Sequence, residues 1–209
     1  MLDKSTPPPP GWLLMTPAGA MAAFAVREPS ADMAALQALT AAPHALTLAE
    51  WLAQAPENAA RHDRFMEQGW IEISPRRLSG PEVQLDGFLP HVIGGLSGSR
   101  RAALASQDGF TLAHTGFTHE EADGLCAAAA DFMDFVERQV TRGWTGVCHA
   151  VSFHEDVAML IPAKTFLLFW VDGVAYWLVI GDEPLINNQA FVELIWGLKM
   201  AGRRFKVAG

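Results

Sequence analysis

The sequence predicts an α/β domain of the α+β kind, with a mostly antiparallel five-stranded sheet and helices on both of its faces. Two Asp-Gly pairs, Asp108-Gly109 and Asp172-Gly173, each lie between apolar runs of β type. Such a pair is the strongest short-range signal for a hairpin, because a type I′ turn needs positive φ at both central residues. A long Ala-rich helical segment separates the two pairs, and an apolar helix follows the second. The strands of the second hairpin are apolar on both faces, so helices are expected above and below the sheet.

The composition excludes several classes of protein. The chain has 209 residues, of which 50% are hydrophobic and 18% charged, so it can bury a substantial core. Its formal net charge of −8 and the lack of an evident basic face argue against a nucleic-acid partner. Cys126 and Cys148 form no C-x-x-C pair and no zinc spacing, which suits two free thiols in a reducing compartment.

No targeting or membrane segment is predicted. The apolar stretch from Trp12 to Val26 is interrupted by Pro17 and Gly19 and lacks the basic start of a signal peptide. No run approaches the ~20 apolar residues that a membrane span needs. The protein is therefore expected in the cytoplasm, without a membrane partner.

The first 80 residues indicate a leader and a small helical appendage. Residues 1–30 are expected to form an extended Pro-rich leader, because Pro7 to Pro10 favours polyproline II. Residues 31–80 predict three short helices and one strand, with a capping box that begins at Thr47. Gly69 is placed to end the third helix in the left-handed conformation, and the alternation from Trp70 to Ile73 is typical of an edge strand.

This appendage resembles small bacterial winged-helix modules over residues 31–74, through the skeleton Thr-Leu-Ala-Glu-Trp-Leu and the later Gly-Trp-Ile-Glu-Ile. A second wing strand is hard to find after it, because Pro75 and Pro81 follow. The third helix mixes Arg61 and Arg64 with acids, which is a poor surface for a major groove. Contact with protein, or a packing role, is therefore expected before DNA reading.

Residues 81–209 are expected to form the main domain. A helix over about Val83–Leu96 precedes the first hairpin, and the Ala-rich helix spans about Thr118–Thr141 after a second capping box. Further strands are expected over Val147–His154 and Val157–Ile161, and a last apolar helix follows the second hairpin. The expected cross-strand pairs are Leu104 with Ala113 and Ala105 with Leu112 in the first hairpin, and Phe169 with Tyr176 and Leu168 with Trp177 in the second.

The order helix, hairpin, helix, strands, hairpin, helix resembles the Roadblock/dynein light-chain family, which has a profilin-like fold. The resemblance covers residues 82–200 and rests on the hairpin of residues 103–116 and the Ala-rich helical segment of residues 121–130. The aromatic-rich segment of residues 166–177 departs from the family pattern. The resemblance implies a non-enzymatic domain and a homodimer in which the central helix and an edge strand pair across a two-fold axis. It also implies partners among small Ras-like GTPases.

Five residues are candidates for an interface. Small side chains on the central helix let another helix approach closely, and an edge strand near residue 150 offers unpaired backbone groups. A tryptophan on the last helix is a candidate anchor. The candidates are Ala127, Ala130, Cys148, Ala150 and Trp196.

No catalytic, metal-binding or cofactor-binding motif is predicted. Metal-type side chains are densest from Cys148 to Asp156, but no tetrahedral set of four ligands is visible there, so an edge strand ending in a polar turn is expected. The loop of residues 94–99 lacks the Gly-x-Ser-x-Gly register of a nucleophile elbow, and the sequence has no phosphate-binding Gly-x-x-x-x-Gly-Lys run. Trp170, Tyr176 and Trp177 are expected to pack the core, with a small-molecule pocket as the alternative.

The sequence thus predicts a non-catalytic Roadblock-like regulatory or scaffold protein that forms a homodimer. Two alternatives stay open at this point. One is a transcriptional regulator that uses the winged-helix region, and the other is a profilin-like domain that senses a small molecule.

Overall fold

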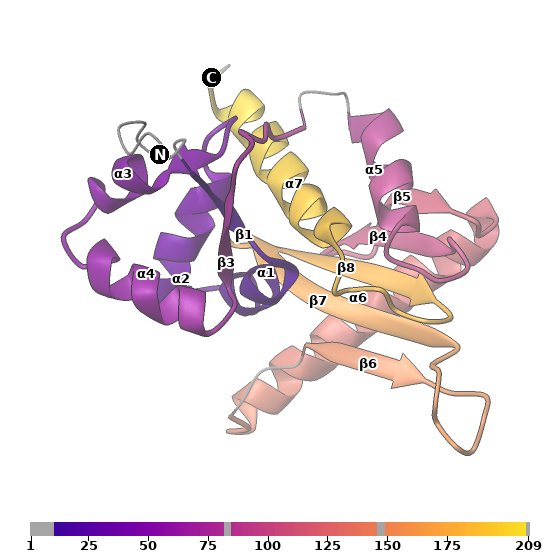
Figure 1. Ribbon diagram of the computed structural model, residues 1–209. Helices are drawn as coiled ribbons and strands as arrows, with labels where there is room; N and C mark the ends of the chain where they lie inside the picture. The colour runs from indigo at the N-terminus through magenta and orange to yellow at the C-terminus, as the bar shows by residue number, and fades with distance from the viewer. Residues whose placement is uncertain (1–10, 82–84, 146–148, 208–209) are drawn as a thin grey trace.

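The computed structural model describes residues 11–81, 85–145 and 149–207. Within these residues the larger sheet has five antiparallel strands in the order β5-β4-β8-β7-β6 (Figure 1). This confirms the predicted α+β class and the five-stranded antiparallel sheet. The strands are β4 (Ala102–Ser106), β5 (Thr111–Thr115), β6 (Ala150–Phe153), β7 (Lys164–Val171) and β8 (Val174–Gly181).

The second Asp-Gly pair forms the predicted type I′ turn. Asp172 has φ 50° and Gly173 has φ 81°, so both central residues are left-handed. The predicted pairs of Phe169 with Tyr176 and of Leu168 with Trp177 are confirmed.

The first Asp-Gly pair forms a different turn. Of its two residues only Gly109 has positive φ, at 82°, and the N–H of Ser106 donates to the carbonyl of Phe110, which makes a three-residue loop. Leu104 pairs with Ala113 as predicted, but Ala105 pairs with Thr111. The predicted pair of Ala105 with Leu112 is therefore wrong, because a β-bulge shifts the register between Leu104 and Ala105.

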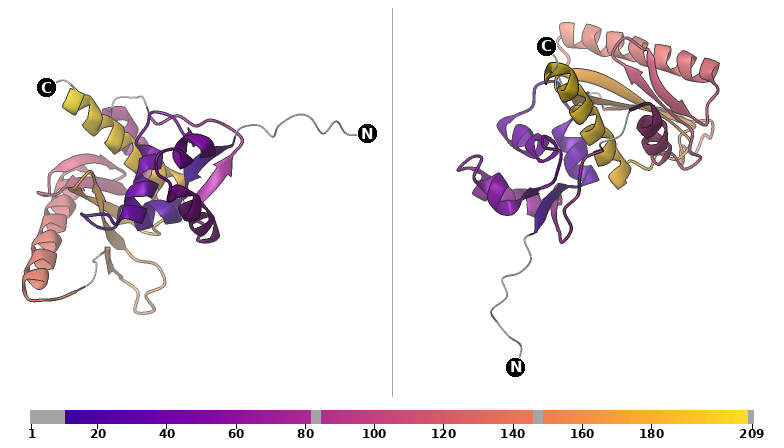
Figure 2. Two further views of the ribbon diagram at one scale, coloured as in Figure 1. Left: turned by 90° about the vertical axis from the view of Figure 1, so that its left-hand side faces the viewer. Right: turned by 90° about the horizontal axis from the view of Figure 1, so that it is seen from above.

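Helices cover both faces of this sheet, as Figures 1 and 2 show. The long helix α6 (His119–Thr141) crosses one face, and α5 (Leu85–Gly94) and α7 (Gln189–Val207) cover the other. The capping box predicted at Thr118 is present. Behind α6 the buried side chains form one cluster with Trp177 at 0% exposure: Ala103, Ala105, Phe117, Ala122, Cys126, Ala129, Met133, Phe166, Leu168, Ala175, Trp177 and Val179.

The segment after β6 is a loop. The strand predicted over Val157–Ile161 is wrong: these residues form bends and turns, and Met159 has φ 51°. The side chain of Asp156 accepts the N–H of Ala158, and its carbonyl accepts the N–H of Met159, so a local turn satisfies these backbone groups in place of a strand partner.

The residues before α5 form a second unit, here called the N-terminal module (residues 11–81). Its three-stranded antiparallel sheet has the order β2-β1-β3. The elements are β1 (Trp12–Met15), α1 (Pro17–Ala23), α2 (Ala31–Gln37), a 3-10 turn (Ala38–Thr40), β2 (Leu46–Thr47), α3 (Leu48–Leu52), α4 (Asn58–Glu67) and β3 (Ile71–Ser74).

The centre of this module comes from residues expected in the leader. From Trp12 onward the predicted leader is instead folded, because β1 pairs with β2 on one side and β3 on the other. The strand beside β3 is therefore β1, which precedes the helices in the chain, whereas a second wing strand would follow β3. The prediction for Pro7 to Pro10 lies outside the described residues. Gly69, at φ 66°, ends α4 as predicted.

The N-terminal module packs on α7 and on the β7–β8 hairpin, so its core is continuous with one face of the larger sheet. Among the described residues, the hydrogen bonds that cross this junction include the following three. Trp196 Nε1 donates to the Ala42 carbonyl at 2.8 Å, and Lys199 Nζ donates to the Gln37 carbonyl at 3.1 Å. The third is a backbone bond of 2.8 Å from Trp170 to Phe24.

Candidate interaction surface

One edge of the larger sheet is open. β6 is the last strand in the sheet order and pairs only with β7 in the described part of the chain. The carbonyls of His149 and Phe153 accept hydrogen bonds from the β7 side. Because backbone groups alternate in direction along a strand, those of Ala150 and Ser152 point toward the free edge. Ala150 is exposed, so this part of the surface can accept another strand.

In its N-terminal half, the outward face of α6 carries small residues beside the exposed acids Glu120 and Asp123. Gly124 and Ala127 are exposed there, one turn apart. Ala127 and Ala130 both lie by the β4–β5 turn: a Cβ added at Gly109 would lie 3.3 Å from the Ala127 Cα and 3.0 Å from the Ala130 Cβ. The small side chain of Ala130 therefore leaves room for the β4–β5 turn of the same chain.

Trp196 is a correction to the predicted interface. Its side chain is only 5% exposed and packs with Leu14 and Ala45 of the N-terminal module. Trp196 thus anchors a contact within the chain and is not available to a partner. Cys148 lies outside the described residues.

The C-terminal end of α6 projects beyond the sheet. The helix stripe that is buried at Ala129 and Met133 continues to Val140, which is 59% exposed because β6 is the last strand. Trp144 follows and is 65% exposed. At the other end of β6, the loop of residues 154–161 also carries exposed apolar side chains, namely Val157, Met159, Leu160 and Ile161.

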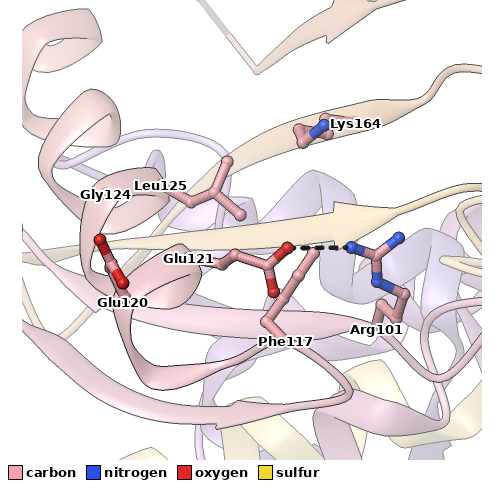
Figure 3. Close-up of a pocket in the computed structure, with 7 residues that line it drawn as sticks. All are labelled: Arg101, Phe117, Glu120, Glu121, Gly124, Leu125 and Lys164. Atoms are coloured by element: carbon pink, nitrogen blue, oxygen red, sulfur yellow. Dashed lines mark ion pairs between the residues drawn. The ribbon is translucent and has the colours of Figure 1, made fainter.

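A cavity of about 280 Å³ lies at the start of α6 (Figure 3). The Arg101 guanidinium stacks over Phe117, 4.7 Å from the ring centre, and lies 3.7 Å from the Glu121 carboxylate. Glu121 is also the acid of the capping box, in which it accepts the backbone N–H of Thr118 at 2.8 Å. The hydrogen bonds from the backbone and hydroxyl of Thr118 lower the pKa of Glu121 from its ordinary value. The Arg101 guanidinium and the Glu121 carboxylate are therefore engaged with one another and with the start of α6.

Glu121→Gln is expected to make stability less sensitive to acid. The pKa of Glu121 is lower in the folded protein than its ordinary value of 4.5. The ionised carboxylate therefore stabilises the fold fully above pH 4.5, and this contribution is lost as the pH falls through the lowered pKa. Glutamine accepts the same N–H without titrating. Melting temperatures measured between pH 6 and pH 3 should therefore fall further for the wild type than for Glu121→Gln. Glu120→Gln, in the same turn but outside the capping box, should follow the wild type; if it follows Glu121→Gln, the capping box is not the cause.

Ser97, in the loop of residues 94–99, has a structural role. Ser97 is buried, donates to the carbonyl of Gly181 at 2.8 Å and accepts the N–H of Arg101, so it ties two strand ends together. Among the described residues, no group of three or more His, Cys, Asp or Glu side chains could hold a metal ion. This finding includes His154 and its acidic neighbours.

Two further arrangements bear on the alternative functions. On α4, Arg61 and Arg64 both pair with Asp32, at 2.9 and 2.6 Å, so one carboxylate engages both guanidinium groups within the module. In the sheet, Trp177 packs under α6 whereas Tyr176 packs on the opposite face. These two aromatic side chains therefore do not line one common pocket.

Sequence reasoning missed the junction between the module and α7. Lys199 is 5% exposed, with its ammonium 5.5 Å from the centre of the Phe24 ring and 3.7 Å from the Asp172 carboxylate. In the sequence, this junction is signalled only by Trp196 and Lys199, which lie one turn apart on an apolar helix. A lysine near the C-terminal end of a helix is equally typical of a side chain that stays in solvent.

The described helices include none that combines the length and apolar character needed to cross a membrane. Comparisons of the chain with family models, with curated proteins and with solved structures found no match.

Proposed function

We propose that this chain is a non-catalytic, Roadblock-like regulatory or scaffold protein of the cytoplasm, which works as a homodimer through protein contacts. The partner class proposed is a small Ras-like GTPase. The observation that supports the proposal is the sheet order β5-β4-β8-β7-β6, with one long helix on one face and two helices on the other. Along the chain these elements follow the order helix, hairpin, helix, strand, hairpin, helix, which is close to the order on which the resemblance to the Roadblock family rests.

The surface supports contact with protein. The free edge of β6 offers backbone donors and acceptors, and the N-terminal half of α6 exposes the small residues Gly124 and Ala127. A second copy related by a two-fold axis satisfies both features, because the same edge and the same helix meet their own equivalents.

The two alternatives have less support. DNA reading needs cations free to meet phosphates, whereas the arginines of α4 are paired with Asp32. The sensor alternative places three aromatic side chains in one pocket, whereas Trp170 and Trp177 pack on one face of the sheet and Tyr176 packs on the other.

The homodimer is expected to depend on the free edge of β6. Light scattering of the intact protein should give twice the chain mass of 22.7 kDa. Ala150→Pro removes a donor from that edge while the hydrogen bonds to β7 remain, so this variant should elute as a monomer with unchanged circular dichroism. Ala150→Ser keeps the N–H and should remain dimeric. A monomeric wild type, or a dimeric Ala150→Pro, would contradict the proposed dimer.

The partner class is tested by capture from native lysate with the intact protein, followed by titration of the recovered GTPase loaded with GDP or with a GTP analogue. Saturable binding that differs between the two nucleotide states supports the proposal. Recovery of no Ras-like GTPase, or equal weak binding in both states, speaks against it.

A further inference from the structure

Two segments with exposed apolar side chains extend beyond β6, one at each end of the strand. In Figure 1 the C-terminal end of α6 and the β6–β7 loop both extend past β6 on the side away from β7, at opposite ends of the strand. The helix end exposes Val140 and Trp144, and the loop exposes Val157 and Leu160 at 96% and 81%. Groups of apolar side chains this exposed are candidate contact sites.

Antiparallel pairing of β6 with the β6 of a second copy brings unlike projections together. In such a pair, Phe153 of one copy lies beside the Ala150 region of the other, because the strands run in opposite directions. The loop that follows Phe153 then continues toward the partner's helix end, which precedes its own β6. Each copy contributes one β6–β7 loop and one C-terminal end of α6. The two-fold axis therefore forms the loop–helix contact twice.

Charge is complementary across this contact. The loop begins with the exposed acids Glu155 and Asp156. The end of α6 carries Arg138 and Arg142, both exposed, beside one acid, Glu137. Within one chain the two groups lie at opposite ends of β6, whereas antiparallel pairing places the acids of each copy near the arginines of the other.

A stable dimer also needs more buried area than pairing of the two β6 strands can supply. β6 has four residues, which span roughly 13 Å at the usual rise, and a stable interface buries about 800 Å² per partner. The two projections add apolar area at both ends of the strand pair.

We propose that, in the homodimer, the β6–β7 loop of each copy packs its apolar tip on the C-terminal turn of α6 of the other copy, guided by the acid–arginine contacts. This inference rests on the proposed function, because it names the segments that complete the proposed dimer.

Photo-crosslinking of the full chain tests the contact directly. A benzophenone amino acid at Leu160 in unlabelled protein, mixed with ¹⁵N-labelled wild type, should crosslink to the labelled peptide that holds Val140–Trp144. The same group at Phe110, which is 71% exposed on the β4–β5 turn, is the matched control and should not reach that peptide. Crosslinks to another segment, or only within one chain, overturn the inference.

Charge reversal tests the guiding contacts. We expect Arg138→Glu with Arg142→Glu, and separately Glu155→Arg with Asp156→Arg, each to raise the dimer dissociation constant by about tenfold or more. A mixture of the two variants should form heterodimers with nearly the wild-type constant, because each contact again joins opposite charges. Reversal of the exposed Arg76 and Arg77 in the N-terminal module is the control and should change little.

The outcomes separate this inference from the proposed function. A wild-type dimer of normal mass without the Leu160 crosslink and without heterodimer rescue overturns the loop contact and leaves the homodimer standing. A monomeric wild type overturns both.

Discussion

Trp196→Ala is expected to lower the free energy of unfolding by about 3–5 kcal/mol. The indole is buried against Leu14 and Ala45, and its N–H donates to the Ala42 carbonyl, so the variant loses packing and leaves that carbonyl without its donor. Urea denaturation at two protein concentrations measures the loss and shows whether it depends on association.

Two controls place the effect within the chain. Trp196→Phe keeps an aromatic ring but not the N–H and should cost less, about 1–2 kcal/mol. Phe110→Ala removes an exposed ring and should stay within about 0.5 kcal/mol of the wild type. If Trp196→Ala abolished association and left the unfolding free energy unchanged, the tryptophan would be an anchor between copies, as the sequence alone suggested.

Gly19→Ala is expected to destabilise the protein by about 2–3 kcal/mol, although alanine favours a helix by about 1 kcal/mol over glycine. Gly19 lies in α1, and a Cβ there would overlap the carbonyl oxygen of Trp70 and lie 2.9 Å from its carbonyl carbon. These are backbone atoms next to β3, so they cannot move aside as a flexible side chain would. Thermal and urea unfolding of the variant give the size of the effect.

Gly87→Ala is the matched control for this prediction. Gly87 lies in α5, is exposed, and a Cβ there would meet nothing within 4 Å. This variant should be as stable as the wild type or more stable by up to about 1 kcal/mol. Equal destabilisation by both substitutions would show that close approach to Trp70 is not the cause.

The sequence was informative where the structure depends on nearby residues. At Asp172-Gly173 two adjacent residues set the turn, and the turn set the register of the longest strand pair. At Asp108-Gly109 the same dipeptide gave a longer loop, since only the glycine took positive φ and a bulge followed. The capping boxes at Thr47 and Thr118 were likewise predictable, because each involves residues three apart.

The failures share one physical reason, which is that the pairing partner lies far away in the chain. Trp12 pairs with Thr47 and Ser74, so no local pattern showed that residues 12–15 form a central strand. An exposed apolar run such as Val157–Ile161 has the same composition as a buried strand, and only the absence of a neighbouring strand in the described chain distinguishes it. Trp196 was predicted as an anchor for a partner, but it is buried within the chain, and its hydrogen-bond acceptor, Ala42, lies in the N-terminal module.

The position of β1 between β2 and β3 has a consequence for synthesis. A ribosome makes β1 before both of its neighbouring strands and before α7, which closes the module through Trp196. Until these elements emerge, Leu13 and Met15, which are buried in the finished protein, lack those packing partners. During translation this apolar strand therefore waits for its pairing partners, which makes the segment a natural client for chaperones that meet chains at the exit tunnel.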